Sequence, residues 1–152
     1  MGFFLILIGV LFISTPNFAD KVVAFVNHFQ TAQVQNTNIY IPTPEYLVGN
    51  IDIYLTARQF SLVWGVFLIA ILGARFIFES PLRRKAENLG DIVFWLGTTY
   101  LVQTFLVAPT QASSLAINAT EWFEFWTAIV MLIGVSLITR AVFLAAARLR
   151  NM

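Results

Sequence analysis

The third long apolar stretch of this chain carries an unusual number of hydrogen-bonding side chains. Thr99 and Gln103 follow Trp95 at intervals of four residues, and Tyr100 and Thr104 form a second row beside them. Residues four apart lie on one face of an α-helix, so about half of this helix would offer polar groups. An unpaired Gln103 amide in hydrocarbon would be costly. Such a face suits either hydrogen bonds to a neighbouring helix or a polar path for a solute or ion.

Contact between helices is the favoured interpretation of this polar face. Proton and ion pathways usually contain ionisable residues, and no Asp, Glu, Lys or His accompanies Gln103 within the stretch. On the preceding stretch, Ser61 and Gly65 are small residues four apart, a spacing that lets two helices approach closely. Ala70 and Ala74 repeat this spacing on another side of the helix. We therefore expect that helix to contact more than one neighbour.

Three further features could bind an ion or a sugar, and each has a plainer explanation. Glu121 and Glu124 are spaced to share an ion, but the sequence suggests no third ligand beside them. His28, the only histidine, would complete a metal site only if another subunit supplied more imidazoles. The Asn-Ala-Thr triplet at 118–120 is an N-glycosylation acceptor, yet Asn118 three residues before Glu121 is also a helix-capping pattern, which competes with sugar attachment.

The residue types that usually carry chemistry are scarce. The chain has no cysteine, which excludes disulfides, iron–sulfur clusters and thiolate zinc sites. The aromatic residues at 122–126 are explained by a belt at the membrane surface. We therefore predict no catalytic, cofactor or metal site in this chain, and no enzyme activity.

These residues lie in a chain with the composition of an integral membrane protein. Hydrophobic residues make up 59% and charged residues 11%, far from globular usage. Four stretches, at 2–19, 60–78, 92–108 and 122–147, approach or exceed the length needed to cross a hydrocarbon core of about 30 Å. The expected fold is an all-α bundle of four transmembrane helices in a single domain over residues 1–152. Three spans remain if the first stretch only dips into the membrane.

The connection between the first two stretches predicts two smaller elements. Residues 14–16 indicate either a kink in one helix or a break, after which Ser14 or Thr15 would cap an amphipathic helix beginning at Pro16. The external segment at 33–56 contains two prolines and strand-forming runs at 38–41 and 51–55. Those runs predict a small β-hairpin or an extended flap. The second span would then begin at Phe60, bounded by Arg58.

Lysines and arginines are distributed unequally between the two sides of the stretches. Lys21 and Arg58 fall on one side, and the other seven of the nine fall on the opposite side, namely Arg75, Arg83, Arg84, Lys85, Arg140, Arg148 and Arg150. Positive residues near spanning helices are retained in the cytoplasm, so we expect that side, with both termini, to be cytoplasmic. There, Ser80 and Pro81 predict a short helix that ends at Leu89 before Gly90. The sorting of charge argues against nucleic acid as a partner.

Four runs of the sequence resemble a family of small, uncharacterised archaeal membrane proteins. They are IGVLFISTPN at 8–17, ESPLRRKAE at 79–87 together with Arg75, IVFWLG at 92–97 and FWTAIVMLIGVSLI at 125–138. The likeness covers most of the chain and rests on no catalytic motif. It implies a multi-span protein of an archaeal plasma membrane, and the family has no established activity to transfer.

The expected function follows from the contrast between absent chemistry and abundant packing residues. We expect a non-catalytic structural or accessory subunit of a multi-subunit membrane complex, with other integral membrane subunits and lipids as partners. The alternative is a small transporter or a homo-oligomeric channel lined by the polar side of the third span.

Overall fold

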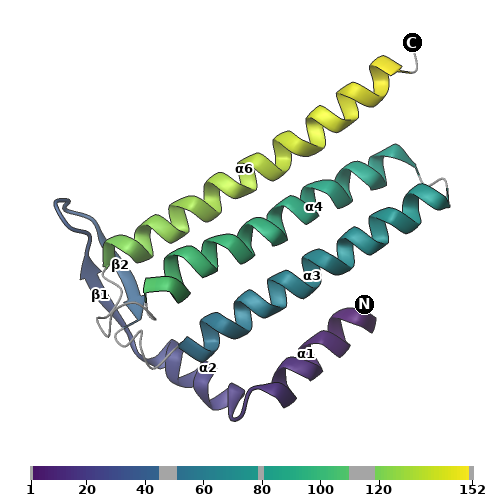
Figure 1. The fold of residues 1–152 in the computed structure, drawn as a ribbon. Helices are drawn as coiled ribbons and strands as arrows, with labels where there is room; N and C mark the ends of the chain where they lie inside the picture. The colour runs from purple at the N-terminus through teal and green to yellow at the C-terminus, as the bar shows by residue number, and fades with distance from the viewer. Residues whose placement is uncertain (1, 45–50, 79–80, 110–118, 151–152) are drawn as a thin grey trace.

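The computed structural model describes residues 2–44, 51–78, 81–109 and 119–150 (Figure 1). In chain order the elements are α1 (Gly2–Ser14), α2 (Phe18–Asn27), β1 (Phe29–Gln33), β2 (Tyr40–Pro44), α3 (Ile51–Ile77), α4 (Leu82–Leu101), the π-helix η2 (Val102–Val107) and α6 (Ala119–Arg150). The predicted fold class is confirmed, because the chain forms an all-α membrane protein with a small antiparallel hairpin.

Three segments are long and apolar enough to cross a membrane: Ile51–Ile77, Leu82–Val107 and Ala119–Ala147. They contain 27, 26 and 29 residues, so at about 1.5 Å per residue each exceeds a hydrocarbon core of about 30 Å. All three begin before the predicted stretches do. The apolar pattern marks only the part of each helix that suits hydrocarbon, whereas the helix itself continues through polar turns at the membrane surface.

The first apolar segment contains a break. α1 ends at Ser14, α2 begins at Phe18, and the two axes differ by 88°. Asn17 turns the chain between them in the left-handed conformation, with φ at 55°. The predicted helix start at Pro16 with a Ser14 or Thr15 cap is wrong, since Asn17 holds the capping position and its side chain makes no capping hydrogen bond. At 13 residues, or about 20 Å, α1 is too short to cross a membrane alone.

Aromatic rings hold α1 against α3. Phe3 stacks on Phe67 with ring centroids 3.7 Å apart. Phe4 meets Phe60 and Trp64 edge-on, at centroid distances of 6.0 and 5.5 Å. Ring pairs of this kind contribute about 0.5–1.5 kcal/mol each beyond the area they bury. The short helix is therefore fixed to the outside of α3 by its first turn.

The predicted hairpin is present, but its strands are partly different from those expected. β1 and β2 pair antiparallel, with Phe29 opposite Pro44. The strand expected at 51–55 is wrong, because these residues form the first turns of α3. Their apolar residues alternate, yet they also fit a helical spacing, and α3 buries Tyr54 at this end of the molecule. The two prolines of β2 are tolerated because a two-stranded sheet leaves one edge of each strand unpaired.

The short separate helix expected to end at Leu89 is also wrong. α4 continues through Gly90 into the third span, and after Leu101 its hydrogen bonding widens into η2. Gly90 serves packing here, because a Cβ at this position would meet the side chain of Arg140 on α6. The glycine therefore admits a neighbouring helix and does not end its own.

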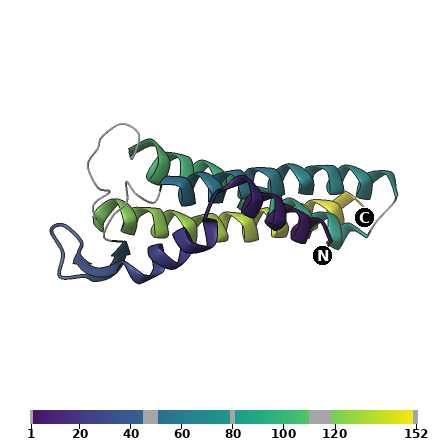
Figure 2. The same cartoon turned by 90° about the horizontal axis from the view of Figure 1, so that it is seen from below.

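The helices form one open layer. Figure 1 shows α6, α4, α3 and α1 side by side in that order, and Figure 2 shows the hairpin at one end of the same helices. α4 packs along α3 on one side and along α6 on the other. We call the end with the hairpin the hairpin end. The opposite end, which carries Arg75, Arg83, Arg84, Lys85 and Arg140, is the arginine end.

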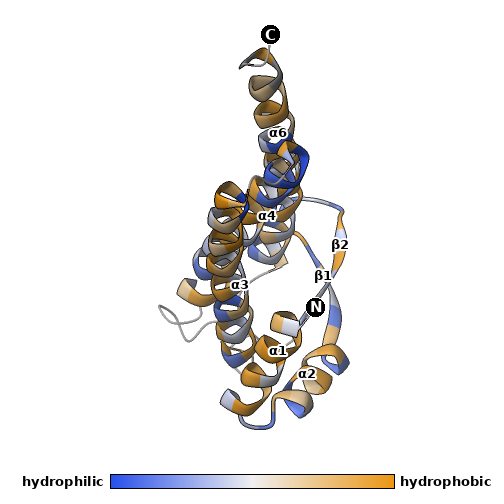
Figure 3. Cartoon of the chain, turned by 90° about the vertical axis from the view of Figure 1, so that its right-hand side faces the viewer, coloured by the Kyte–Doolittle hydropathy of each residue, from blue (hydrophilic) through white to orange (hydrophobic). Residues whose placement is uncertain are grey.

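Most of the surface of the spans is left open by this arrangement. In the apolar part of each span, only 17%, 28% and 6% of the residues are buried, in chain order. Figure 3 shows that the spanning helices are predominantly apolar. The open surface is therefore suited to contact with lipid or with other membrane helices.

Candidate functional site

The small residues predicted on the second span face α4. Ser61 and Gly65 are both buried, Ser61 with 1% of its surface exposed. Thr99 donates a hydrogen bond to Ser61, with 2.9 Å between the two side-chain oxygens. The Ser61 hydroxyl lies within hydrogen-bonding distance of carbonyl oxygens of its own helix, so it donates there. Gly65 lies against Leu96, since a Cβ at Gly65 would be 2.6 Å from Leu96 Cδ2. Three of the six candidate packing residues thus lie at the interface between α3 and α4.

Gln103 extends this contact toward the hairpin end. Arg58 Nη1 donates a hydrogen bond to Gln103 Oε1 across the interface between α3 and η2. Gln103 lies in the π-helical segment. Such segments are rare in proteins, and those that occur are often found at functional sites. We call Arg58, Ser61, Thr99 and Gln103 the polar seam.

Arg58 is the seam residue that the sequence interpretation missed. It was expected at the boundary of a span that begins at Phe60, whereas α3 begins at Ile51 and includes Arg58 in its third turn. A signal was present, because Tyr54 precedes Arg58 by four residues and both lie on the side of α3 that faces α4 and η2. The run at 51–55 reads equally well as a strand, which hid this spacing.

The structure does not bring Tyr100 and Thr104 into the seam. Both side chains are exposed, Tyr100 at 68%. They follow Thr99 and Gln103 by one residue each, so they lie on an adjacent face of the helix. The two polar rows of the third span therefore differ, since one binds α3 and the other faces away from it.

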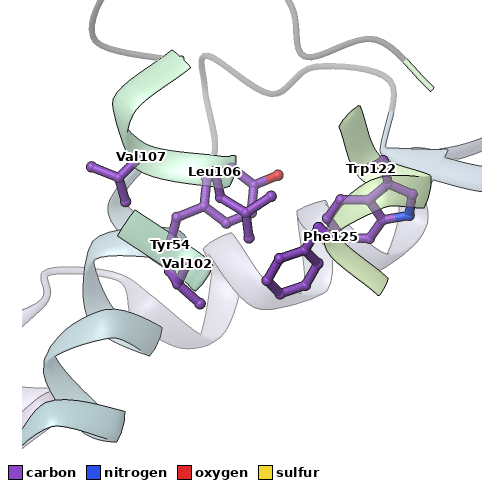
Figure 4. Packing of buried hydrophobic residues seen from close by; sticks show 6 residues of the cluster. All are labelled: Tyr54, Val102, Leu106, Val107, Trp122 and Phe125. Atoms are coloured by element: carbon purple, nitrogen blue, oxygen red, sulfur yellow. The ribbon is translucent and has the colours of Figure 1, made fainter. Parts of the chain in front are cut away.

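A hydrophobic core closes the hairpin end beside the seam. Figure 4 shows its six buried residues, which are Tyr54, Val102, Leu106, Val107, Trp122 and Phe125. Trp122 Nε1 donates to the backbone oxygen of Pro42 at 3.1 Å, which ties the hairpin to α6. The aromatic residues predicted as a surface belt are therefore divided. Trp122 and Phe125 belong to the core, whereas Phe123 and Trp126 are exposed.

An open pocket of about 280 Å³ lies at the break between α1 and α2. On its wall, Lys21 Nζ lies 2.5 Å from Asp52 Oδ2. Thr56 donates to the backbone oxygen of Asp52 at 2.7 Å, so the hydroxyl of Thr15, 3.2 Å away, donates to Thr56. These groups satisfy one another across the pocket wall. They therefore join the segment around the α1–α2 break to the first turns of α3.

Further polar ties join the three spans toward the arginine end. Asn88 Nδ2 donates to a backbone oxygen of α3 at 2.8 Å, and Ser136 donates to a backbone oxygen of α4 at 2.9 Å. Arg140 Nη2 lies 2.6 Å from Asp91 Oδ1 and joins α6 to α4. From the sequence, Arg140 served only to indicate the cytoplasmic side, and no partner was predicted for it. Partners on different helices are not fixed by any spacing along the chain.

His28 and Glu124, two of the residues considered for ion binding, lie at the end of α2 and on α6. His28 lies at the end of α2, exposed, with Nδ1 2.6 Å from the backbone oxygen of Ala24, to which it donates. Glu124 is exposed on α6. In the part of the chain that the structure describes, no group of three or more His, Cys, Asp or Glu residues could hold a metal ion. Asn118, the glycosylation candidate, lies outside the described residues.

The polar seam suits binding better than it suits reaction. It offers one guanidinium, two hydroxyls and one amide, and the hydrogen bonds and ion pairs between described residues bring no carboxylate or imidazole to it. General acid–base and nucleophilic catalysis need a base within hydrogen-bonding reach of the reacting group. The seam can join helices and can bind an oxyanion.

Comparison with known proteins adds no assignment to this geometry. No protein-family model, no curated protein and no solved structure matches the chain. The resemblance to archaeal membrane proteins stays a prediction.

Proposed function

We propose that the chain is a non-catalytic accessory subunit of a larger integral membrane complex. The observation that carries the proposal is the open layer of helices. α6 packs mainly on α4, and only 6% of the residues in its apolar part are buried. A membrane helix gains little from hiding apolar surface from lipid, so stable contacts need matched shapes and hydrogen bonds. The broad outer surface of α6 offers such a shape to another subunit.

The use of the polar groups supports a packing role. Thr99 and Gln103 bind partners on α3, and Asn88 and Ser136 bond backbone oxygens of neighbouring helices. Each such contact stabilises a membrane bundle by about 0.6 to 2 kcal/mol. Together these hydrogen bonds join α4 to α3 and to α6, and so limit the movement of the three helices relative to one another. Its two faces remain available for other subunits.

The proposed location is the plasma membrane, with the arginine end in the cytoplasm and the hairpin end outside. Arg75, Arg83, Arg84 and Lys85 surround the connection between α3 and α4, and translocating them would be unfavourable. In this orientation the C-terminus is cytoplasmic, and α1 points its beginning toward the same side (Figure 1).

An alanine scan of the outer surface of α6 tests the proposal. Val130, Met131 and Ile138 are each more than half exposed. Lipid chains adapt to any shape, so alanine at a lipid-facing position leaves the complex intact, whereas alanine at a subunit contact removes matched surface. We expect at least one variant to lose a polypeptide that co-purifies with the wild type, while the isolated chain unfolds at an unchanged temperature. If no variant changes the set of co-purifying polypeptides, α6 faces only lipid and the proposal loses its support.

A second candidate function, a small transporter or homo-oligomeric channel, is favoured by one observation. Tyr100 and Thr104 are exposed hydroxyl-bearing residues on a spanning helix, and several copies of the chain could line a polar path with them. Thr104→Val and Tyr100→Phe remove these hydroxyls with little change of shape. A change of solute flux in vesicles containing the purified chain would favour the channel. Unchanged and negligible flux is the result expected of an accessory subunit.

A further inference from the structure

Arg58 carries a charge that the described part of the chain does not neutralise. A guanidinium stays protonated and has several N–H donors in a planar fork. The described residues give Arg58 one side-chain acceptor, the neutral amide oxygen of Gln103, and none of their carboxylates forms an ion pair with it. Lys21, the other cation of the hairpin end, is paired with Asp52. Within the described residues, Arg58 therefore has donors and charge left for an oxyanion.

Arg58 lies in the third turn of α3, at the hairpin end of its span, where we infer the level of the lipid headgroups. Gln103 lies in η2, which shares the core of the hairpin end with Trp122, and the exposed Trp126 follows Trp122 by four residues on α6. Tryptophan side chains gather where the hydrocarbon meets the headgroups. Phosphate is the oxyanion present at that level in a phospholipid bilayer.

The surface beside Arg58 suits the rest of a lipid. Leu62, Val66 and Ile69 follow Arg58 along one face of α3 at helical spacing. Their side chains are 45%, 55% and 48% exposed. An apolar strip thus leads away from the guanidinium toward the middle of the span. A phosphate on Arg58 would place an acyl chain along this strip.

We propose that Arg58 binds the phosphate of a membrane lipid and that Gln103 is the positioning residue for its guanidinium. The amide oxygen of Gln103 holds Nη1 and leaves the other N–H groups of the fork for two phosphate oxygens, the geometry that arginine favours. The polar seam then has a second role, because it fixes a lipid at the junction of α3 and η2. This site stands whether or not the chain has partner subunits.

The test compares three variants in detergent micelles by native mass spectrometry. Arg58→Gln removes the charge. Gln103→Glu keeps Arg58 but supplies an internal carboxylate that competes with phosphate, and it serves if Arg58→Gln fails to fold. Lys21→Gln is the matched control, since it removes one positive charge from the same end at a residue that is already paired. The probes are phosphatidylglycerol, a digalactosyl lipid with the same acyl chains and no phosphate, and glycerol phosphate as a competitor.

We expect the wild type to retain phosphatidylglycerol more strongly than the digalactosyl lipid. Arg58→Gln and Gln103→Glu should bind it about tenfold more weakly or worse, as the loss of hydrogen bonds to a charged group implies, whereas Lys21→Gln should match the wild type. Equal retention of both lipids, equal weakening by Lys21→Gln, or displacement of the lipid by dilute glycerol phosphate would overturn the proposal. It also fails if Arg58→Gln sheds a co-purifying polypeptide while lipid retention is unchanged, because the oxyanion is then a carboxylate of a partner subunit.

Discussion

Replacing Gly65 by alanine tests the close contact between α3 and α4. The new Cβ would lie 2.6 Å from Leu96 Cδ2 and 3.0 Å from Leu96 Cγ. Carbon atoms in favourable contact are about 3.5–4.0 Å apart, so the Leu96 side chain would have to retreat by about 1 Å. Because Leu96 lies between two helices joined by the seam, this movement disturbs their packing.

The magnitude follows from two opposed effects. Overpacking of a well-filled contact lowers the free energy of unfolding by about 1–3 kcal/mol. Alanine also favours a helix over glycine by about 1 kcal/mol, so Gly65→Ala should show a net loss of up to about 2 kcal/mol. Gly73→Ala on the same helix is the matched control, since a Cβ at Gly73 meets no atom within 4 Å. It should keep the gain without the clash, so the two variants should differ by about 1–3 kcal/mol.

Reversible unfolding in mixed detergent and lipid micelles, followed by circular dichroism, measures this difference. Both variants should retain the helix content of the wild type under native conditions. If Gly65→Ala is as stable as Gly73→Ala, α3 and α4 are not in close contact at Gly65, which would contradict the packing of these two helices.

Three further predictions concern the rest of the layer. Asn88→Asp should lower the free energy of unfolding by about 1–3 kcal/mol, because the buried side-chain donor to α3 is replaced by an acceptor. The control Glu87→Gln, at an exposed position of the same helix, should leave the free energy of unfolding nearly unchanged. Equal effects of the two substitutions would contradict the buried hydrogen bond. Asp91→Arg and Arg140→Asp should each lower the free energy of unfolding, and the double variant should recover part of that loss. If the two changes in free energy simply add in the double variant, the ion pair contributes nothing to stability. In intact cells, a membrane-impermeant maleimide should label Asn38→Cys in the hairpin and leave Arg84→Cys at the arginine end unlabelled. The opposite labelling pattern would show that the orientation in the membrane is the reverse of the proposed one.

The class of the fold could be predicted from the sequence because it depends on composition and on the length of apolar runs. The limits of the elements could not, because polar turns at the membrane surface are not distinguished by apolar pattern. Residues 51–55 alternate like a strand and form a helix. In the sequence, Gly90 is typical of the position that follows a helix end. In the structure it contacts Arg140, and this role depends on a helix about 50 residues further along the chain.

The site was partly predictable for a similar reason. Thr99 and Gln103 stand out because polar residues in a span need partners, and Ser61 and Gly65 stand out by their small size and spacing. Arg58 did not, since its place in the seam depends on where α3 begins. The sequence also gave no means to separate the row of Thr99 and Gln103 from the adjacent row with Tyr100, because that depends on which side of α4 meets α3.

The accessory role rests on whether other polypeptides cover the open layer. The most direct measurement is the mass of the complex that contains this chain, taken from its native membranes through an affinity tag in mild detergent and determined by native mass spectrometry. The proposal predicts a defined assembly that includes at least one different integral membrane polypeptide. A solitary chain, retained with lipid alone under conditions that keep membrane complexes intact, would contradict it.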